Sequence, residues 1–191
     1  MKSENTQTNW DALSRLFHWL GAALIAVLLA HGWWMKTILD RPIRLDHYSW
    51  HVSIGYAVLA LLIMRLLWRW RNARPAPPAQ SLRWERWAAA GGHIGLYLLM
   101  LAMTFTGWAL AGTFRQPLDA SLLGFIDVPA ITSPANPELH ESLEEWHALL
   151  AWPLTILIAI HILSAFYHLW VKKDGVMQRM LSAGSREQGT V

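Results

Sequence analysis

The sequence has no cysteine and little charge: 15% of its 191 residues are charged, against about 25% in an average soluble domain. Without cysteine, the chain holds no disulfide bond, iron–sulfur cluster, thiolate-bound haem or haem attached through a C-x-x-C-H motif. The net charge of +3 indicates no nucleic-acid-binding patch. Because 54% of the residues are hydrophobic, we expect a chain solvated by lipid, in which the 9 His are the main chemical resource.

Four apolar runs are long enough to cross a bilayer. A helix needs about 20 apolar residues to span about 30 Å of hydrocarbon. The first run resembles the core of a signal peptide, but it continues through Trp34, so we expect it to be retained. These runs predict an all-α, integral membrane four-helix bundle, formed by one domain over residues 1–191. The expected helices cover residues 10–36, 43–71, 82–114 and 137–173.

Capping residues indicate where these helices begin. Asn and Ser side chains accept hydrogen bonds from the free N–H groups of a first turn, and proline is favoured at the first helical position. The expected start signals are Thr8 or Asn9, Asp40 with Pro42, Ser81, and Asn136 with Pro137, in chain order.

The basic residues predict the orientation, because Lys and Arg near membrane spans are biased to the cytoplasm. The connection 69–86 carries five Arg, and the tail after residue 171 is also basic. The connection 115–145 is acidic, and Arg115 is its only Arg or Lys. We therefore expect both termini in the cytoplasm and the acidic connection outside, in a multi-pass protein of a bacterial inner membrane.

Four histidines lie deep within the predicted helices. His18, His51, His93 and His147 are each about ten to twelve residues from a helix start, or about 15 Å along the axis. A strongly polar side chain at this depth is expensive, so its default interpretation is functional. Given the orientation, His18 and His93 lie at the cytoplasmic level, and His51 and His147 lie at the external level.

The fourth helix has a second deep histidine, His161. It follows His147 by fourteen residues, which returns it to within about 40° of the same face and moves it about 21 Å along the axis. This arrangement suits two haems stacked along a four-helix bundle. Matching levels pair His51 with His147 outside and His18 with His161 inside, although the spacing leaves His93 as an alternative to His18.

A simpler interpretation applies to each histidine alone. Polar side chains in membrane helices often hydrogen-bond a neighbouring hydroxyl or a backbone carbonyl. Such histidines would not be expected to fall into two matched layers, so the joint pattern favours ligation.

Three further residues are candidates for cofactor binding near the cytoplasmic level. Arg65 could neutralise haem propionates, or it could extend to the lipid headgroups. His168 and Arg15 could line a quinone pocket beside the inner haem, with interfacial solvation as the alternative.

Several short motifs occur in order along the chain: Phe17-His18-Trp19-Leu20, His51 followed by Arg65, Gly92-His93, Trp146-His147, and His161 to His168 with Lys173-Asp174 after it. Together they resemble the bacterial cytochrome b561 family over nearly the whole chain. The resemblance implies a dihaem protein of the inner membrane, with His18, His51, His147 and His161 as axial ligands of two b haems. His93 also matches a family position.

One branch of this family is a superoxide oxidase, which passes electrons from superoxide to ubiquinone. The acidic connection 115–145 is a departure that matters, because an acidic surface repels the superoxide anion. The resemblance thus implies ubiquinone or another quinone as one partner. The other partner would be an external donor or periplasmic protein, with superoxide as one candidate.

Three functions are consistent with these observations. The leading hypothesis is transmembrane electron transfer through two haems, as an oxidoreductase if the chain acts alone. A second is a haem-bearing anchor subunit that passes electrons for a separate redox partner, such as a hydrogenase. A third, a histidine-lined metal transporter, is disfavoured because the spans lack carboxylates and a continuous polar path.

Overall fold

The computed structural model describes residues 9–37, 44–72, 75–78, 81–116, 118–134 and 136–181. Most of these residues are helical. A small hairpin of two strands follows α3, and a π-helical turn and a short helix follow α4. The elements are α1 (Ala12–Thr37), α2 (Arg44–Arg71), α3 (Arg83–Ala111), β1 (Ser121–Leu122), β2 (Ile126–Asp127), α4 (Pro137–Tyr167), η1 (His168–Lys172) and α5 (Gln178–Leu181).

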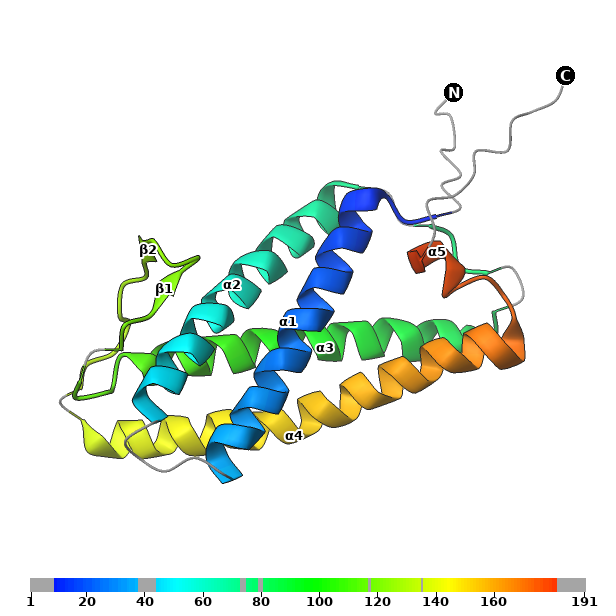
Figure 1. Ribbon diagram of the computed structural model, residues 1–191. Coiled ribbons are helices and arrows are strands. Elements are labelled where there is room, and N and C mark those ends of the chain that lie inside the picture. Colours follow the sequence, from blue (N-terminus) through cyan, green and yellow to red (C-terminus); the bar gives the residue numbers. More distant parts are fainter. Residues whose placement is uncertain are drawn as a thin grey trace, which may run out of the picture.

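The long helices form two antiparallel pairs. Helix α1 packs along α2, α3 packs along α4, and α2 also contacts α3. Figure 1 shows the two pairs crossing at an angle. We name the two ends of the bundle after the histidines of α4, the His147 end and the His161 end. The backbone N–H of Trp10 donates to the carbonyl of Arg179, so the first and last described segments meet at the His161 end.

The outer surface of the bundle is apolar. Leu98 on α3, Ile63 on α2 and Leu163 on α4 are among many large hydrophobic side chains that are exposed. Exposed apolar side chains are favourable when the solvent is lipid, and helices satisfy their backbone groups internally. All four long helices have the length and composition to cross a membrane. The predicted all-α membrane bundle is confirmed, whereas the cytoplasmic location of the termini stays a prediction.

The helix starts follow capping chemistry, but at partly different residues. Asn136 accepts a hydrogen bond from the N–H of Leu139 at 3.1 Å and caps α4, as predicted. The cap of α1 is Asp11, whose carboxylate accepts from the N–H and the hydroxyl of Ser14, so the prediction of Asn9 was wrong. Thr8, Asp40 and Pro42 lie outside the described residues.

Helix α3 also starts without the predicted cap. Its last non-helical residue is Leu82, not Ser81, and the Glu85 carboxylate accepts a hydrogen bond from the Leu82 N–H at 3.0 Å. Acidic side chains are favourable in a first turn, because they satisfy free N–H groups and face the positive end of the helix dipole.

Helices α3 and α4 are shorter than the sequence indicated. Helix α3 ends at Ala111, three residues before the expected limit, and a turn at Gly112 and Thr113 follows. At Gly112 a Cβ would lie 2.5 Å from the Thr132 hydroxyl, so the returning chain packs directly on this turn. After Tyr167 the α4 axis continues as the π-helical turn η1.

Candidate functional site

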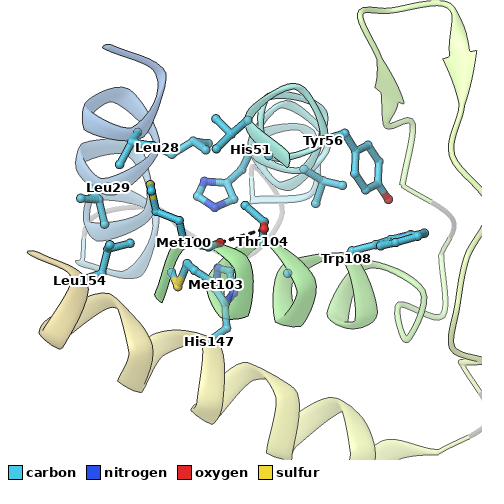
Figure 2. A pocket seen from close by; sticks show the side chains of 15 residues that line it. Leu28, Leu29, His51, Tyr56, Met100, Met103, Thr104, Trp108, His147 and Leu154 are labelled. Carbon is cyan, nitrogen blue, oxygen red and sulfur yellow. Dashed lines mark hydrogen bonds between the residues drawn. The ribbon is translucent and has the colours of Figure 1, made fainter. Parts of the chain in front are cut away.

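His51 and His147 face each other inside the bundle, near the end named after the second. His51 comes from α2 and His147 from α4, and their ring centroids are 6.2 Å apart at an angle of 79°. Figure 2 shows both rings directed into one space between the helices. Their equal depth in the predicted helices indicated this pair, and the structure brings the two residues together.

The orientation of the His147 ring is set by α3. Thr106 donates its hydroxyl proton to backbone carbonyls of the preceding turn, with the Ala102 oxygen 2.8 Å away. The same hydroxyl oxygen lies 3.1 Å from Nδ1 of His147. The Met103 carbonyl is a further hydrogen-bond partner of the His147 ring, and when Thr106 donates to its own helix, the hydroxyl oxygen accepts from Nδ1–H. His147 therefore carries its proton on Nδ1, which leaves Nε2 free to bind a metal.

Glycines allow the helices to approach both rings closely. A Cβ at Gly107 would lie 2.9 Å from Cε1 of His147, and one at Gly32 would lie 3.4 Å from Cε1 of His51. A contact of 2.9 Å is too short for a real side chain. Gly107 is thus the residue that lets α3 pass beside the His147 imidazole.

A cavity with mostly apolar walls lies between His51 and His147. All four long helices line it, with Leu28, Tyr56, Met103 and Leu154 as examples (Figure 2). Its empty volume is about 610 Å³, counting the part that opens to the surroundings. Cofactor sites combine apolar walls with a few placed polar groups. This cavity has that character, and the two imidazoles are prominent among its polar groups.

A second cavity borders the same two histidines and continues toward the end of the bundle. It measures about 1050 Å³, again including open space. Its walls contain Trp33 and Trp152, and also the charged residues Lys36 and Glu144. The histidine pair therefore connects with the surface at the His147 end.

Three histidines cluster toward the opposite end. His18 on α1 lies 6.2 Å from His161 on α4, measured between ring centroids, at an angle of 75°. His93 on α3 lies 5.5 Å from His161 at 71°. The structure thus brings together all three residues that the sequence placed at this level. Because α4 is continuous from His147 to His161, fourteen residues separate the two groups by about 21 Å along its axis.

The spacing of two histidine pairs fits ligation of one metal ion from opposite sides. Such imidazoles place their ring centroids about 6.3 Å apart, because each metal–nitrogen bond is about 2 Å long and the nitrogen lies about 1.15 Å from the centroid. The separations His51–His147 and His18–His161 are both 6.2 Å, whereas His93–His161 is shorter by 0.7 Å, from 6.2 to 5.5 Å.

Two buried nitrogens also point to a bound group. Nδ1 of His18 and Nδ1 of His51 are buried and have no hydrogen-bond partner among the described residues. Buried polar atoms in native proteins are nearly always partnered by protein, by water or by a bound group. The residues present therefore fit a cofactor held by histidine.

Arg65 lies beside the His18–His161 pair. Its guanidinium is over the ring of Tyr97 at 5.7 Å, and it is close enough to both His18 and His161 to interact with them electrostatically. Arg69, one turn further along α2, stacks on the same ring at 5.6 Å. Arg65 is therefore directed into the bundle, and the alternative of extension to the headgroups is better suited to Arg69.

His168 and Arg15 lie at the His161 end, each engaged with a residue of its own segment. Nδ1 of His168 is 2.6 Å from the Asp174 carboxylate. The Arg15 guanidinium donates to the Trp10 carbonyl at 3.0 Å. Their expected role around a quinone stays a prediction.

Three residues at the His147 end were not predicted from the sequence. Thr106 was not singled out, because a Thr in a membrane helix usually bonds only its own preceding turn. His31 and His47 were assigned nothing, yet their ring nitrogens are 3.1 Å apart. The His31 ring stacks on His51 at 5.8 Å. A signal was available, since His47 and His51 are one turn apart on α2.

The chain is similar to known proteins over nearly its full length. A family model described as prokaryotic cytochrome b561 matches residues 9–183. Cytochrome b561 homolog 2 of Escherichia coli K12 is 32% identical over 197 residues, which cover 99% of this chain and 100% of the relative. A probable superoxide oxidase CybB of Yersinia pestis is 29% identical, covering 86% and 90% of the two chains.

A further relative is a subunit of a larger enzyme. It is the probable Ni/Fe-hydrogenase 1 B-type cytochrome subunit of Escherichia coli K12, 22% identical over 95% of this chain and 92% of the relative. The match of the family model covers well over half of the chain and all four membrane helices. The chain belongs to the prokaryotic cytochrome b561 family, as a multi-pass protein of the bacterial inner membrane that carries electrons across it through b-type haem.

Proposed function

We propose that the chain holds two b haems and moves electrons between a donor at the His147 end and a quinone at the His161 end. One haem would be held by His51 and His147, and the other by His18 and His161. The observation that carries the proposal is the repeated geometry, two histidine pairs from facing helices with the same 6.2 Å ring separation. When bound, b haem supplies reversible one-electron chemistry.

His18 is the better partner for His161 than His93 is. The His18–His161 separation equals that of the other pair, and Nδ1 of His18 is buried without a partner among the described residues. The shorter His93–His161 separation of 5.5 Å suits a ring that packs against the ligand pair. His93 would then position His161 without binding iron.

The residues around the pairs have distinct roles in this proposal. Thr106 holds the proton of His147 on Nδ1, and so aims Nε2 at the cavity. Arg65 brings a positive charge to the His18–His161 pair, where it would balance the negative propionates of a haem. The apolar cavity walls exclude water and thereby lower the dielectric constant around both sites.

The donor would enter through the second cavity, which joins His51 and His147 to the surface. Lys36 and Glu144 line it with opposite charges. Superoxide is one candidate donor, because a similar protein is a probable superoxide oxidase. Lys36 would attract this anion and Glu144 would oppose it. A periplasmic redox protein is the other candidate.

The quinone would bind at the His161 end, near His168 and Arg15. The N–H groups of Arg15 suit the carbonyl oxygens of a quinone, and the Nε2 lone pair of His168 suits the hydroxyl group of a quinol. The Asp174 carboxylate orients the His168 ring at 2.6 Å and accepts from its Nδ1–H, so Nε2 faces away from Asp174.

A second candidate function is that of an anchor subunit. The observation that favours it is the similarity to a hydrogenase B-type cytochrome subunit over 95% of this chain. In that case a soluble redox subunit would co-purify with the chain, and the isolated chain would reduce no quinone. The metal transporter is not supported, since no group of three metal-ligating side chains is found among the described residues.

The test is the haem content of purified variants. The wild type, His147→Ala and His18→Ala are compared with His93→Ala, and with His140→Ala as the control on α4. His140 bonds Thr113 near the surface, so its loss should leave haem binding intact. The pyridine haemochrome assay should give two b haems per chain for the wild type, His93→Ala and His140→Ala, and about one for the other two.

Other results would overturn parts of the proposal. A colourless wild type would exclude haem binding by the chain alone. Loss of one haem in His93→Ala but not in His18→Ala would show that His93 on α3, and not His18, is the second ligand beside His161.

A further inference from the structure

The hairpin after α3 exposes large apolar side chains at its tip. Strands β1 and β2 pair antiparallel, with Ser121 opposite Asp127 and Leu122 opposite Ile126. The connecting residues are Leu123, Gly124 and Phe125. Leu123 is 65% exposed and Phe125 is 75% exposed. In water, such an apolar tip would be unfavourable.

The backbone of this tip is also unusual. Leu123 has a φ of 58° and Gly124 a φ of 81°. The left-handed region suits glycine or asparagine and is costly for a bulky residue. A leucine here is therefore less favourable than asparagine within the hairpin itself, and its exposed side chain makes a contact outside the hairpin worth seeking.

The hairpin is attached to the bundle on both sides. The N–H of Ser121 donates to the hydroxyl of Ser53 on α2 at 3.2 Å. The Trp108 indole on α3 donates to the Pro129 carbonyl at 3.0 Å, just after β2. Figure 1 shows the hairpin folded back beside α2, not extended beyond the ends of the helices.

Ser53 gives the hairpin an approximate depth. The membrane-spanning part of α2, Leu45–Arg71, has 27 residues and is therefore about 40 Å long, some 10 Å more than the hydrocarbon core. If the excess is shared equally between the two ends, Ser53 lies about 7 Å inside the hydrocarbon boundary. The base of the hairpin, where Ser121 meets Ser53, therefore lies close to the hydrocarbon boundary, and β1 packs against α2.

The charged residues of this segment lie at the base of the hairpin and not at its tip. No charged residue lies between Leu122 and Ile126, whereas Asp127 is at the base of the hairpin and Asp119 precedes it. Apart from the bond from the Phe125 N–H to the Leu122 carbonyl at 3.4 Å, no backbone hydrogen bond of the tip is found among the described residues, which keeps the tip out of the bilayer centre. This combination suits the boundary between headgroups and acyl chains.

We propose that the β1–β2 hairpin inserts its tip, Leu123 to Phe125, into the lipid leaflet at the His147 end of the bundle. The hairpin is thereby a membrane-anchoring element that holds the connection between α3 and α4 against the bilayer. Its partner is the acyl-chain boundary of phospholipids. The inference is independent of the haem assignment, since it rests on the hairpin and α2 alone.

The absence of cysteine permits a direct test with single labels. The full chain with Phe125→Cys carries a nitroxide and is reconstituted into vesicles of phosphatidylcholine and phosphatidylglycerol. Ile63→Cys, on the exposed apolar face of α2, is the lipid control, and Asp119→Cys, at an exposed position, is the water control. Relaxation of each label by oxygen and by a water-soluble nickel complex is measured, after each variant is shown to elute as the wild type does.

We expect the oxygen-to-nickel accessibility ratio at residue 125 to be severalfold above that at residue 119 and below that at residue 63. The same ranking should hold for Leu123→Cys. A ratio at residue 125 equal to that at residue 119 would overturn the proposal and make the tip a docking surface for a soluble protein. A label shielded from both reagents would also overturn it, because protein would then cover the tip.

Discussion

At the scale of single residues, the hydrogen bonding of Nδ1 decides which ring nitrogen of an imidazole is available to a bound group. On His147 this atom is held by the Thr106 hydroxyl. On His18 and His51 it is buried without a partner among the described residues. The axial residues of the two proposed sites therefore differ in how firmly their rings are oriented, and His147 is the best oriented of these three.

The contact between Thr106 and His147 leads to a prediction. Thr106→Val keeps the shape of the side chain but removes the hydroxyl from the His147 ring, which leaves the Met103 carbonyl as its hydrogen-bond partner. We expect the affinity of the His51–His147 site for haem to fall about 10–100-fold, the usual cost of losing such an outer contact. Titration of haem into the apo-protein, followed by difference absorption, would measure this loss.

A matched control lies two residues away on the same helix. The Thr104 hydroxyl donates to the Met100 and Leu101 carbonyls, and Thr104 lines the same cavity. Thr104→Val should leave haem affinity within about twofold, because the loss of a hydroxyl bonded to its own helix costs little. Equal losses in both variants would mean that the Thr106 contact has no special role.

At the scale of elements, α4 connects the two proposed sites and ends in an ordered turn. After η1, Lys173 has a positive φ of 50°, and the chain turns back so that Asp174 meets His168. Burial alone would raise the pKa of the Asp174 carboxyl. Hydrogen bonds from the His168 side chain and the Val176 N–H outweigh burial, and the pKa is lowered from its ordinary value of 3.8.

The stability conferred by Asp174 should depend on pH. A carboxyl with a lowered folded-state pKa stabilises the fold above its unfolded-state pKa of 3.8, and this stabilisation is lost as the pH falls through the folded-state pKa. Asp174→Asn should therefore lower the Tm at pH 7. The expected loss in the free energy of unfolding is about 1.5–3 kcal/mol, the usual contribution of a hydrogen bond to a charged group. The difference from the wild type should shrink below about pH 4.

Thermal melts in detergent from pH 7 to pH 3 would check this dependence. Asp119→Asn is the control, since Asp119 is exposed in the connection after α3. A Tm difference for Asp174→Asn that stayed constant over the whole pH range would show that the carboxylate charge is irrelevant to the turn.

At the scale of the whole molecule, both described ends of the chain meet at the His161 end. Helix α5 contributes to this arrangement. The Met180 carbonyl accepts from the Trp19 indole at 3.1 Å, and the Arg179 guanidinium donates to the Ala76 carbonyl at 2.6 Å. The C-terminal segment thus joins α1 to the connection between α2 and α3, on the side that the basic residues assign to the cytoplasm.

This orientation can be tested with two single cysteines. Asn72→Cys, at the end of α2, should react with a membrane-impermeant maleimide only after the cells are lysed, because the Arg-rich connection stays inside. Asp119→Cys should react in intact spheroplasts. The reverse pattern would invert the bundle and put the donor end in the cytoplasm.

The sequence by itself determined the class of the protein and the level of each histidine. Span length and the 1.5 Å rise per residue are local properties, so counting residues from each helix start was enough to assign depths. The count placed His51 and His147 at one level, and His18, His93 and His161 at the other. The cap at Asn136 was likewise predicted from neighbours in the chain, whereas Asp11 was missed because several polar residues there compete as caps.

Only the tertiary structure decided which rings face each other and what holds them. The 6.2 Å separations depend on the rotation of each helix and on the angle between the two helix pairs, which no local pattern encodes. The contact of Thr106 with His147 joins residues 41 positions apart, and the bond from Ser121 to Ser53 spans 68. Such contacts exist only once the helices have packed, because packing sets the distance between side chains that the chain leaves far apart.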